Sequence, residues 1–183
     1  MRKKKEKERQ ALRRQYLATQ RASQPLVSAV GPISPEQLRV NAIHEAGHAV
    51  VMTRIAHGCD VVTVDPQEVE RLTGYAMPGF TQPVRKQIDV PTYLCTTLAG
   101  VTSEAMHAND GKINAHEEDF NHAEEVLDRA GIFDKTQRDS AMATARAETE
   151  KLVAEHKADI LAVADALVQR LTLRGHEVRA LLK

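Results

Sequence analysis

Residues 34–58, SPEQLRVNAIHEAGHAVVMTRIAHG, carry the clearest helix signal of the chain. Ser34 precedes a proline at the first helical position, and Gln37 stands three residues after the serine, which is the pattern of an N-terminal capping box. Apolar residues then recur at helical spacing, and Gly58 stands where a helix usually stops. We therefore expect one helix from Ser34 to about His57, at the start of the folded body.

The same stretch contains the motif H-E-x-x-H, formed by His44, Glu45 and His48. Residues four apart on a helix lie on the same face, so the two histidines can present imidazole nitrogens to one metal ion. Glu45 projects beside the pair, where its carboxylate can take a proton from a water molecule that the metal activates. Gly47 is unfavourable in mid-helix, so it predicts close approach by another element. The motif as a whole predicts a catalytic metal site.

Downstream, the sequence predicts a small sheet and several more helices. β-Branched residues at 61–64 indicate a short strand that ends at Asp65-Pro66, and residues 72–77 are expected to form a second strand, followed by a loop through Pro83. Helical spacing resumes over four further stretches, at 89–108, at 115–130, at 134–171 as one long or two consecutive helices, and at 177–182. We predict a mainly α fold with a small two- or three-stranded β-sheet.

Charge is distributed unevenly along this chain of 183 residues, although its formal net charge is zero. Residues 1–24 hold nine basic residues against two acidic ones, so this arm carries about +7 and the remainder of the chain about −7. The arm has few apolar positions and is expected to be a frayed helix or disordered. Prolines and a glycine in 25–33 indicate a linker. Residues 34–183 are the predicted folded domain.

The composition excludes several broad classes of protein. A net charge of zero excludes a uniformly basic nucleic-acid binder and a uniformly acidic disordered chain. Residues 1–24 could contact nucleic acid or an anionic membrane, but Tyr16 is their only aromatic residue for base stacking, and most charge runs are simply solvated. Cys59 and Cys95 are the only cysteines, and the sequence has no secretory signal and no apolar run near 18 residues. These features predict a cytoplasmic protein with free thiols.

The motif needs a third ligand, because a catalytic zinc site usually takes three protein ligands and leaves a fourth position for water. The helix expected at 115–130 offers five candidates: His116, Glu117, Glu118, Asp119 and His122. Their spacing alone does not choose among them. Two interpretations of Glu104 stay open. Its carboxylate orients the imidazole of a metal ligand, or it is an exposed glutamate on a helix.

Several segments together resemble the FtsH-type peptidase domain, the protease half of membrane-anchored AAA+ zinc proteases. HEAGHAV at 44–50 resembles the zinc-binding helix of that family, and LAGVTSEA at 98–105 resembles its L-G-G-R-x-A-E-E segment. EDFNHA at 118–123 resembles its S-N-D-[IL]-x-x-A segment, and LTLRGHEV at 171–178 resembles its closing T-L-x-G-x-E-[IV] element. The resemblance covers about residues 36–182.

This resemblance implies a zincin-like helical domain that works as a zinc endopeptidase on unfolded or flexible polypeptide segments. By the family's pattern, His44, His48 and Asp119 hold one Zn²⁺, and Glu45 is the general base. The family further implies a sheet edge that can hold an extended substrate and a homo-oligomeric ring.

The chain also departs from the family pattern. Val101 and Ala105 replace an arginine and a glutamate of the family, so substrate handling is expected to differ. The sequence contains no G-x-x-x-x-G-K-[ST] phosphate loop and no membrane anchor, so we expect the peptidase module alone, with any unfolding supplied by a separate ATPase.

Two other interpretations of the motif stay open. The first is a non-catalytic module that kept the metal helix and recruits a partner through the basic arm or the sheet edge. An intact Glu45 favours the enzyme, because a purely structural metal site has no need of a carboxylate between its ligands. The second is a chance occurrence of the motif in a helical protein, which predicts no stoichiometric metal.

Overall fold

The computed structural model describes residues 33–74, 77–84, 86–108 and 117–183. Ser34–Lys183 form one compact unit. The predicted basic arm at 1–24 and nearly all of the predicted linker at 25–33 lie outside the described residues. Within the described ranges, no helix is both long enough and apolar enough to cross a membrane.

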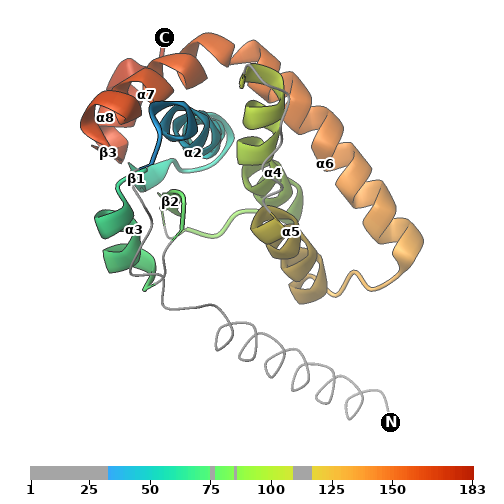
Figure 1. Cartoon of the computed structure of the whole chain (residues 1–183). Helices are drawn as coiled ribbons and strands as arrows, with labels where there is room; N and C mark the ends of the chain where they lie inside the picture. The colour runs from blue at the N-terminus through green and yellow to red at the C-terminus, as the bar shows by residue number, and fades with distance from the viewer. Residues whose placement is uncertain (1–32, 75–76, 85, 109–116) are drawn as a thin grey trace. The chain divides into compact units, whose positions relative to one another are not determined.

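Seven helices and three strands make up the described part of the chain, and Figure 1 shows their arrangement. In chain order they are α2 (Pro35–Ile55), β1 (Cys59–Thr63), α3 (Pro66–Thr73), β2 (Phe80–Pro83), α4 (Val90–His107), α5 (Glu117–Arg129), α6 (Lys135–Glu155), α7 (Lys157–Arg170), β3 (Thr172–Arg174) and α8 (Gly175–Leu181). The prediction of a mainly α fold with a small sheet is confirmed.

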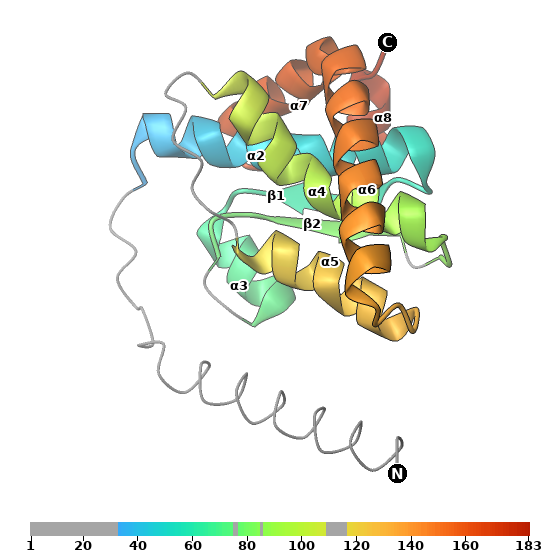
Figure 2. The ribbon, with the colours of Figure 1, turned by 90° about the vertical axis from the view of Figure 1, so that its right-hand side faces the viewer.

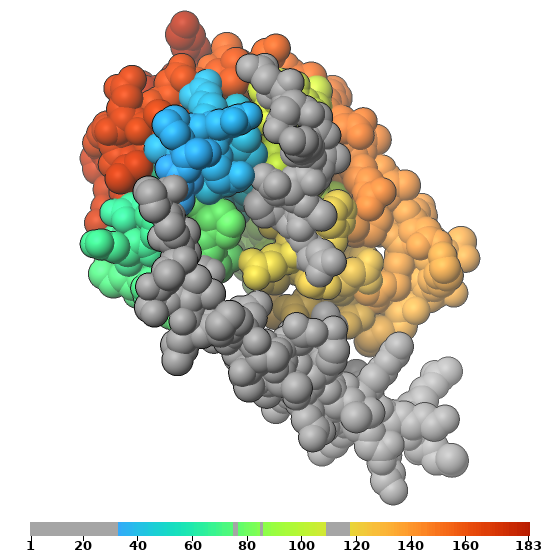
Figure 3. All heavy atoms as spheres, viewed as in Figure 1, coloured from blue at the N-terminus to red at the C-terminus, as the bar shows by residue number. Residues whose placement is uncertain are grey.

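Helix α2 forms the centre of this unit and is seen end-on in Figure 1. Helices α4 and α7 pack along it, and strands β1 and β2 lie against it as well. Every residue from Val40 to Val51 is buried, whereas the N-terminal end of the helix reaches the surface, in blue in Figure 3. Polar side chains in the buried part must therefore find partners on the surrounding elements.

The start of α2 follows directly from its sequence. Ser34 caps the helix by accepting a hydrogen bond from the Gln37 backbone N–H at 3.1 Å, and Pro35 occupies the first turn. Ser34 thus pairs a backbone N–H that has no partner within the helix. Pro35, which lacks an N–H, stands at a position where the helix has no acceptor for one. The predicted start of the helix at Ser34 is confirmed by this cap.

The sheet is antiparallel, with the strand order β2-β1-β3. Val62 in the central strand lies opposite Thr81 of β2 and Leu173 of β3. Within the described residues β2 pairs with β1 alone, so it is an edge strand. Because Thr81 is buried at 9% exposure, this edge strand directs one polar side chain inward, toward α2.

The second strand predicted at 72–77 is wrong. Residues up to Thr73 belong to α3, which Asp65 caps and Gly74 ends in the left-handed conformation, and the second strand is β2. Asp65-Pro66 followed eight residues later by Gly74 is the start and stop signal of a helix, whereas the prediction gave Asp65-Pro66 only as the end of a strand. The loop predicted through Pro83 is wrong only over its last four residues, which form β2, because Pro78 and Gly79 lie outside any helix or strand.

The C-terminal region forms two consecutive helices, α6 and α7, which meet at His156. Figure 2 shows α6 crossing in front of α4, and the two helices are in contact. The last helix begins at Gly175, two residues before the predicted start. Strand β3 was missed, because its three residues are too short for a periodic signal.

Candidate metal centre

Helix α4 approaches α2 closely because Gly47 has no side chain. A Cβ atom at Gly47 would stand 2.6 Å from the Ala99 carbonyl oxygen and would overlap the Ser103 side chain. Real Cβ contacts are essentially never this short, so only glycine fits here. The close approach predicted at Gly47 is thus confirmed, and it brings polar groups of α4 within reach of the α2 histidines.

The outer nitrogens of both motif imidazoles bond to α4. His44 Nδ1 lies 3.3 Å from Glu104 Oε2, and His48 Nδ1 lies 2.8 Å from the Thr96 carbonyl oxygen. A carbonyl oxygen and an ionised carboxylate can only accept, so both Nδ1 atoms donate. In the neutral rings the lone pair is therefore on Nε2, which is the arrangement that a metal-binding histidine requires.

The inner nitrogens converge with a carboxylate from α5. The Nε2 atoms of His44 and His48 stand 3.2 Å apart. Asp119 Oδ2 lies 3.3 Å from the first and 3.4 Å from the second, and it is buried with no hydrogen-bond partner among the residues that the structure describes. Three electron-pair donors facing one another are unfavourable unless a cation lies between them. His44, His48 and Asp119 could therefore hold a metal ion, each with one ligand atom.

The space beside these ligand atoms depends on Gly100 of α4. A Cβ atom at this position would stand 2.5 Å from His44 Nε2 and would overlap His48 Nε2 as well. Any side chain at Gly100 would therefore occupy the place where the two rings meet. Glycine at position 100 therefore leaves the space in which the two imidazoles meet.

The charges of the group shift the pKa of each member. Burial lowers the pKa of His44, but Asp119, Glu104 and Glu45 outweigh burial and raise it to about 10. Burial also lowers the pKa of His48, and the Asp119 carboxylate more than compensates, so the net shift is upward. Burial raises the pKa of Asp119, but the two imidazoles lower it well below its usual range. When no metal is bound, protons on the rings supply the positive charge that the carboxylate requires.

Glu45 follows His44 in the chain but is not one of the three residues of the ligand group, His44, His48 and Asp119. Its side chain is buried at 7% exposure, and Oε2 accepts a hydrogen bond of 2.7 Å from Thr81 Oγ1. Gly79 leaves room for it, because a Cβ atom there would stand 2.6 Å from Glu45 Oε1. The carboxylate is thus held at the cleft that His44, His48 and Asp119 also line.

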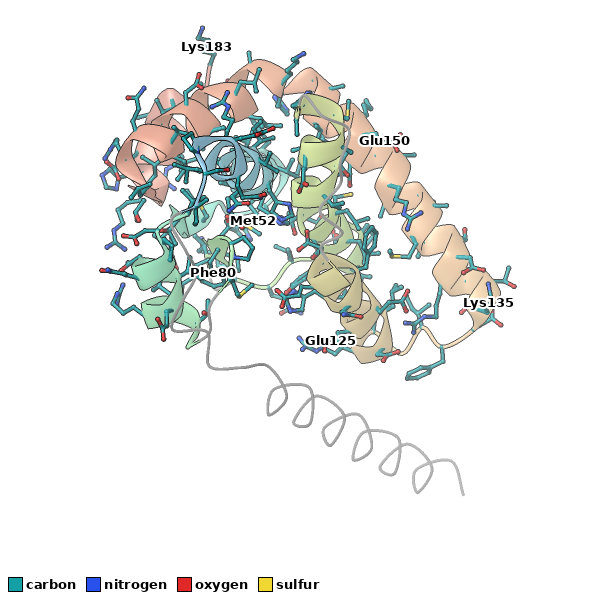
Figure 4. The ribbon with its side chains drawn as sticks, in the orientation of Figure 1. Met52, Phe80, Glu125, Lys135, Glu150 and Lys183 are labelled. Atoms are coloured by element: carbon teal, nitrogen blue, oxygen red, sulfur yellow. The ribbon has the colours of Figure 1, made fainter. Side chains whose placement is uncertain are left out.

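A cleft of about 570 Å³ is lined by the ligand group and by Glu45. Met52 of α2 and Phe80 of β2, both labelled in Figure 4, line it together with Tyr93 of α4. The edge strand β2 contributes to one part of its wall, and α5 contributes Asp119 and His122 to another. Its volume lies in the range of ligand-binding clefts.

The five candidates for the third ligand have different positions. Asp119 joins the two imidazoles, whereas Glu118 and His122 line the cleft outside the ligand group. His116 and the side chain of Glu117 lie outside the part of the chain that the structure describes. An exposed helix glutamate is excluded as the role of Glu104, because this residue is 1% exposed and contacts the His44 imidazole.

Sequence analysis missed Thr81 and Thr96. Thr96 contacts His48 through its backbone carbonyl, which leaves no side-chain signal. Thr81 belongs to the segment expected to be a loop, so nothing indicated that its hydroxyl would face α2. Cys59 and Cys95 are both buried and free, as predicted, and neither belongs to the site.

Comparison with known proteins does not assign the chain to a family. No protein-family model matches it, and no curated protein matches it significantly.

Proposed function

We propose that this protein is a zinc-dependent endopeptidase that hydrolyses peptide bonds in unfolded or flexible polypeptide segments. The observation that carries the proposal is the convergence of His44, His48 and Asp119 next to the Glu45 carboxylate, at one cleft. The resemblance of residues 36–182 to FtsH-type peptidases supports the same activity. A homo-oligomeric ring and a separate ATPase that unfolds substrates are part of this proposal.

The ligand atoms suit zinc in kind and in spacing. Two imidazole nitrogens and one carboxylate oxygen are a donor set that zinc accepts. In a tetrahedral site with bonds of about 2.0–2.1 Å, neighbouring ligand atoms stand about 3.3 Å apart. The three separations here are 3.2, 3.3 and 3.4 Å. Three protein ligands leave one position open, which favours a catalytic over a structural site.

The chain's own residues account for the proton transfers of peptide hydrolysis. Zinc, when bound, lowers the pKa of water and polarises the scissile carbonyl group. Glu45 takes the proton as water attacks the carbonyl carbon, and then delivers it to the leaving amine. Glu104 and the Thr96 carbonyl hold the two imidazoles in the orientation that presents Nε2.

The cleft favours a polypeptide over a small molecule. It runs along β2, and edge strands present backbone N–H and C=O groups that an extended peptide can pair with. A folded domain would not fit a cleft of about 570 Å³, whereas an extended segment would. We therefore expect unstructured proteins such as casein to be substrates.

The direct test is elemental analysis of the wild type and of His48→Ala and Asp119→Ala, together with casein hydrolysis with and without a chelator. About one zinc per chain, lost in both variants, and chelator-sensitive hydrolysis would establish the proposal. Full zinc occupancy without hydrolysis of casein or of any other unstructured substrate would indicate a non-catalytic binding module instead. Absence of zinc from freshly prepared wild type would refute the metal site.

Glu104→Gln is expected to weaken zinc binding by about 10- to 100-fold, because the partner that orients a ligand imidazole loses its charge. The substitution keeps the shape of this fully buried side chain, so the fold should persist. Competition with a chromophoric chelator measures the change in affinity. Glu150→Gln, on the exposed part of α6, is the control and should bind zinc like the wild type. Equal affinity in the two variants would contradict the role of Glu104.

Zinc affinity is expected to rise with pH and zinc binding to release protons. Because the pKa of His44 is raised from 6.5 to about 10, this ring is protonated at pH 7 in protein stripped of metal, and zinc must displace its proton. Asp119 is already ionised there, since its pKa is lowered. In the stripped protein the His44 shift stabilises the fold below pH 6.5, and this contribution is lost as pH rises through about 10.

Calorimetry in buffers of different ionisation enthalpy measures the protons released. We expect at least about one proton per zinc at pH 7 and an affinity that falls about tenfold per pH unit toward pH 6. An affinity independent of pH between 6 and 8 would show that the histidines are not the ligands.

A further inference from the structure

We propose that Thr81 is a positioning residue for the general base, acting through a hydrogen bond from the edge strand β2 to the Glu45 carboxylate. The inference rests on the proposed function, since Glu45 matters as a base only if the site hydrolyses peptides. It concerns a residue that the H-E-x-x-H motif does not contain and that lies 36 positions away from Glu45 in the chain.

The hydrogen bond between Thr81 and Glu45 is short and buried, and its direction is defined. Thr81 Oγ1 lies 2.7 Å from Glu45 Oε2 and 3.2 Å from the Glu45 backbone oxygen. Both of these oxygens accept, so the hydroxyl donates, and the shorter distance favours the carboxylate. Thr81 is 9% exposed and Glu45 is 7% exposed, so water competes little with this bond.

The bond leaves one carboxylate oxygen for chemistry. Oε2 is engaged by Thr81, whereas Oε1 has no hydrogen-bond partner among the described residues and faces Gly79. Gly79 and Thr81 lie on one segment of chain: the glycine leaves the space that the carboxyl group fills, and the threonine bonds that group. The bond restricts the side-chain torsions of Glu45, so Oε1 keeps a constant direction.

The placement of Thr81 links the base to the sheet. Thr81 lies opposite Val62, and β2 is the strand along which an extended substrate would lie. A strand that slipped by one residue would turn the hydroxyl to the other face. The register of β2 therefore determines the orientation of the Glu45 carboxylate, and the same register would align the substrate.

The test compares two substitutions of opposite character, Thr81→Val and Thr81→Ser. Valine keeps the shape and removes the hydroxyl, whereas serine keeps the hydroxyl and removes a methyl group. We expect Thr81→Val to lower kcat for an unstructured peptide by about 10- to 100-fold with little change in KM. Thr81→Ser should stay within about threefold of the wild type, and both variants should keep the wild-type zinc content. A role in packing alone predicts the reverse order, with serine the more damaging, and would overturn the inference.

A second measurement does not depend on activity. The carboxyl carbon resonance of Glu45, labelled with ¹³C and identified by its loss in Glu45→Gln, reports the hydrogen bond in protein stripped of zinc. We expect the resonance to move in Thr81→Val and to coincide with the wild type in Thr81→Ser. An unmoved resonance in Thr81→Val would refute the bond.

The two proposals fail in different ways. If the wild type hydrolyses peptides and Thr81→Val does so equally well, the positioning role fails and the proposed function stands. If zinc-loaded wild type hydrolyses nothing, the proposed function fails, and the role of Thr81 in catalysis fails with it.

Discussion

A Glu45→Gln variant is expected to hydrolyse unstructured peptides about 10²–10⁴-fold more slowly than the wild type while it keeps one zinc per chain. Glutamine has nearly the same shape, and its side-chain oxygen can still accept the hydrogen bond from Thr81. It cannot take a proton from water or return one to the leaving amine. Because Glu45 is not among the three converging ligand residues, metal binding should persist. Steady-state kinetics and elemental analysis of the same preparation measure both quantities.

The matched control is Glu118→Gln, which makes the same chemical change at another carboxylate of the same cleft. Glu118 is exposed and lies outside the ligand group, so this variant should retain activity within about twofold. Comparing Glu45→Gln with Glu118→Gln distinguishes the effect of losing the general base from the effect of losing a negative charge in the cleft. Equal damage in both variants, or full activity in Glu45→Gln, would show that Glu45 is not the base.

Gly100→Ala is expected to reduce zinc affinity by about 10²-fold or more and to abolish hydrolysis with it. The added Cβ would stand 2.5 Å from His44 Nε2 and would overlap His48 Nε2, so the imidazoles could not hold their positions. Alanine favours a helix by about 1 kcal/mol over glycine, so α4 itself should not be weakened. Chelator competition measures the affinity, and circular dichroism of the stripped protein reports the helix content.

Thr102→Ala, two residues further along α4, is the control for this substitution. Thr102 is half-buried, and among the described residues its hydroxyl bonds only to the Leu98 carbonyl oxygen within its own helix. It should therefore bind zinc like the wild type. Wild-type zinc affinity in Gly100→Ala would contradict the placement of α4 against the histidines.

The helices were predicted well because their signals are local. Ser34, Asp89 and Asp134 each cap a helix by accepting a hydrogen bond from the backbone N–H of the residue three positions further on. Such caps involve neighbours in sequence and can be identified without the fold. The segment from Asp65 to Gly74 carries the same signals, and they indicate the helix that forms there in place of the start of the predicted strand at 72–77.

The sheet was harder to predict because its strands are short and pair over long distances. β2 contains two polar residues and a terminal proline, so its composition does not mark it as a strand. Pairing with β1 makes it one, and the pairing requires the whole unit to fold. Thr81 was missed for this reason, since its inward direction follows from the register.

The sequence by itself determined the two histidines and the glutamate of the site, because residues at i and i+4 of one helix must share a face whatever surrounds them. It also determined where that helix begins. Spacing did not choose the third candidate, and Asp119 was implied only by the family resemblance; the tertiary structure brings Asp119, and not Glu118 or His122, to the two imidazoles. The contact of Glu104 with His44 and the hydrogen bond from Thr81 to Glu45 were likewise decided by packing. The physical reason is the same in each case: contacts between separate elements depend on how closely the helices approach and on the strand register, and these are properties of the folded unit.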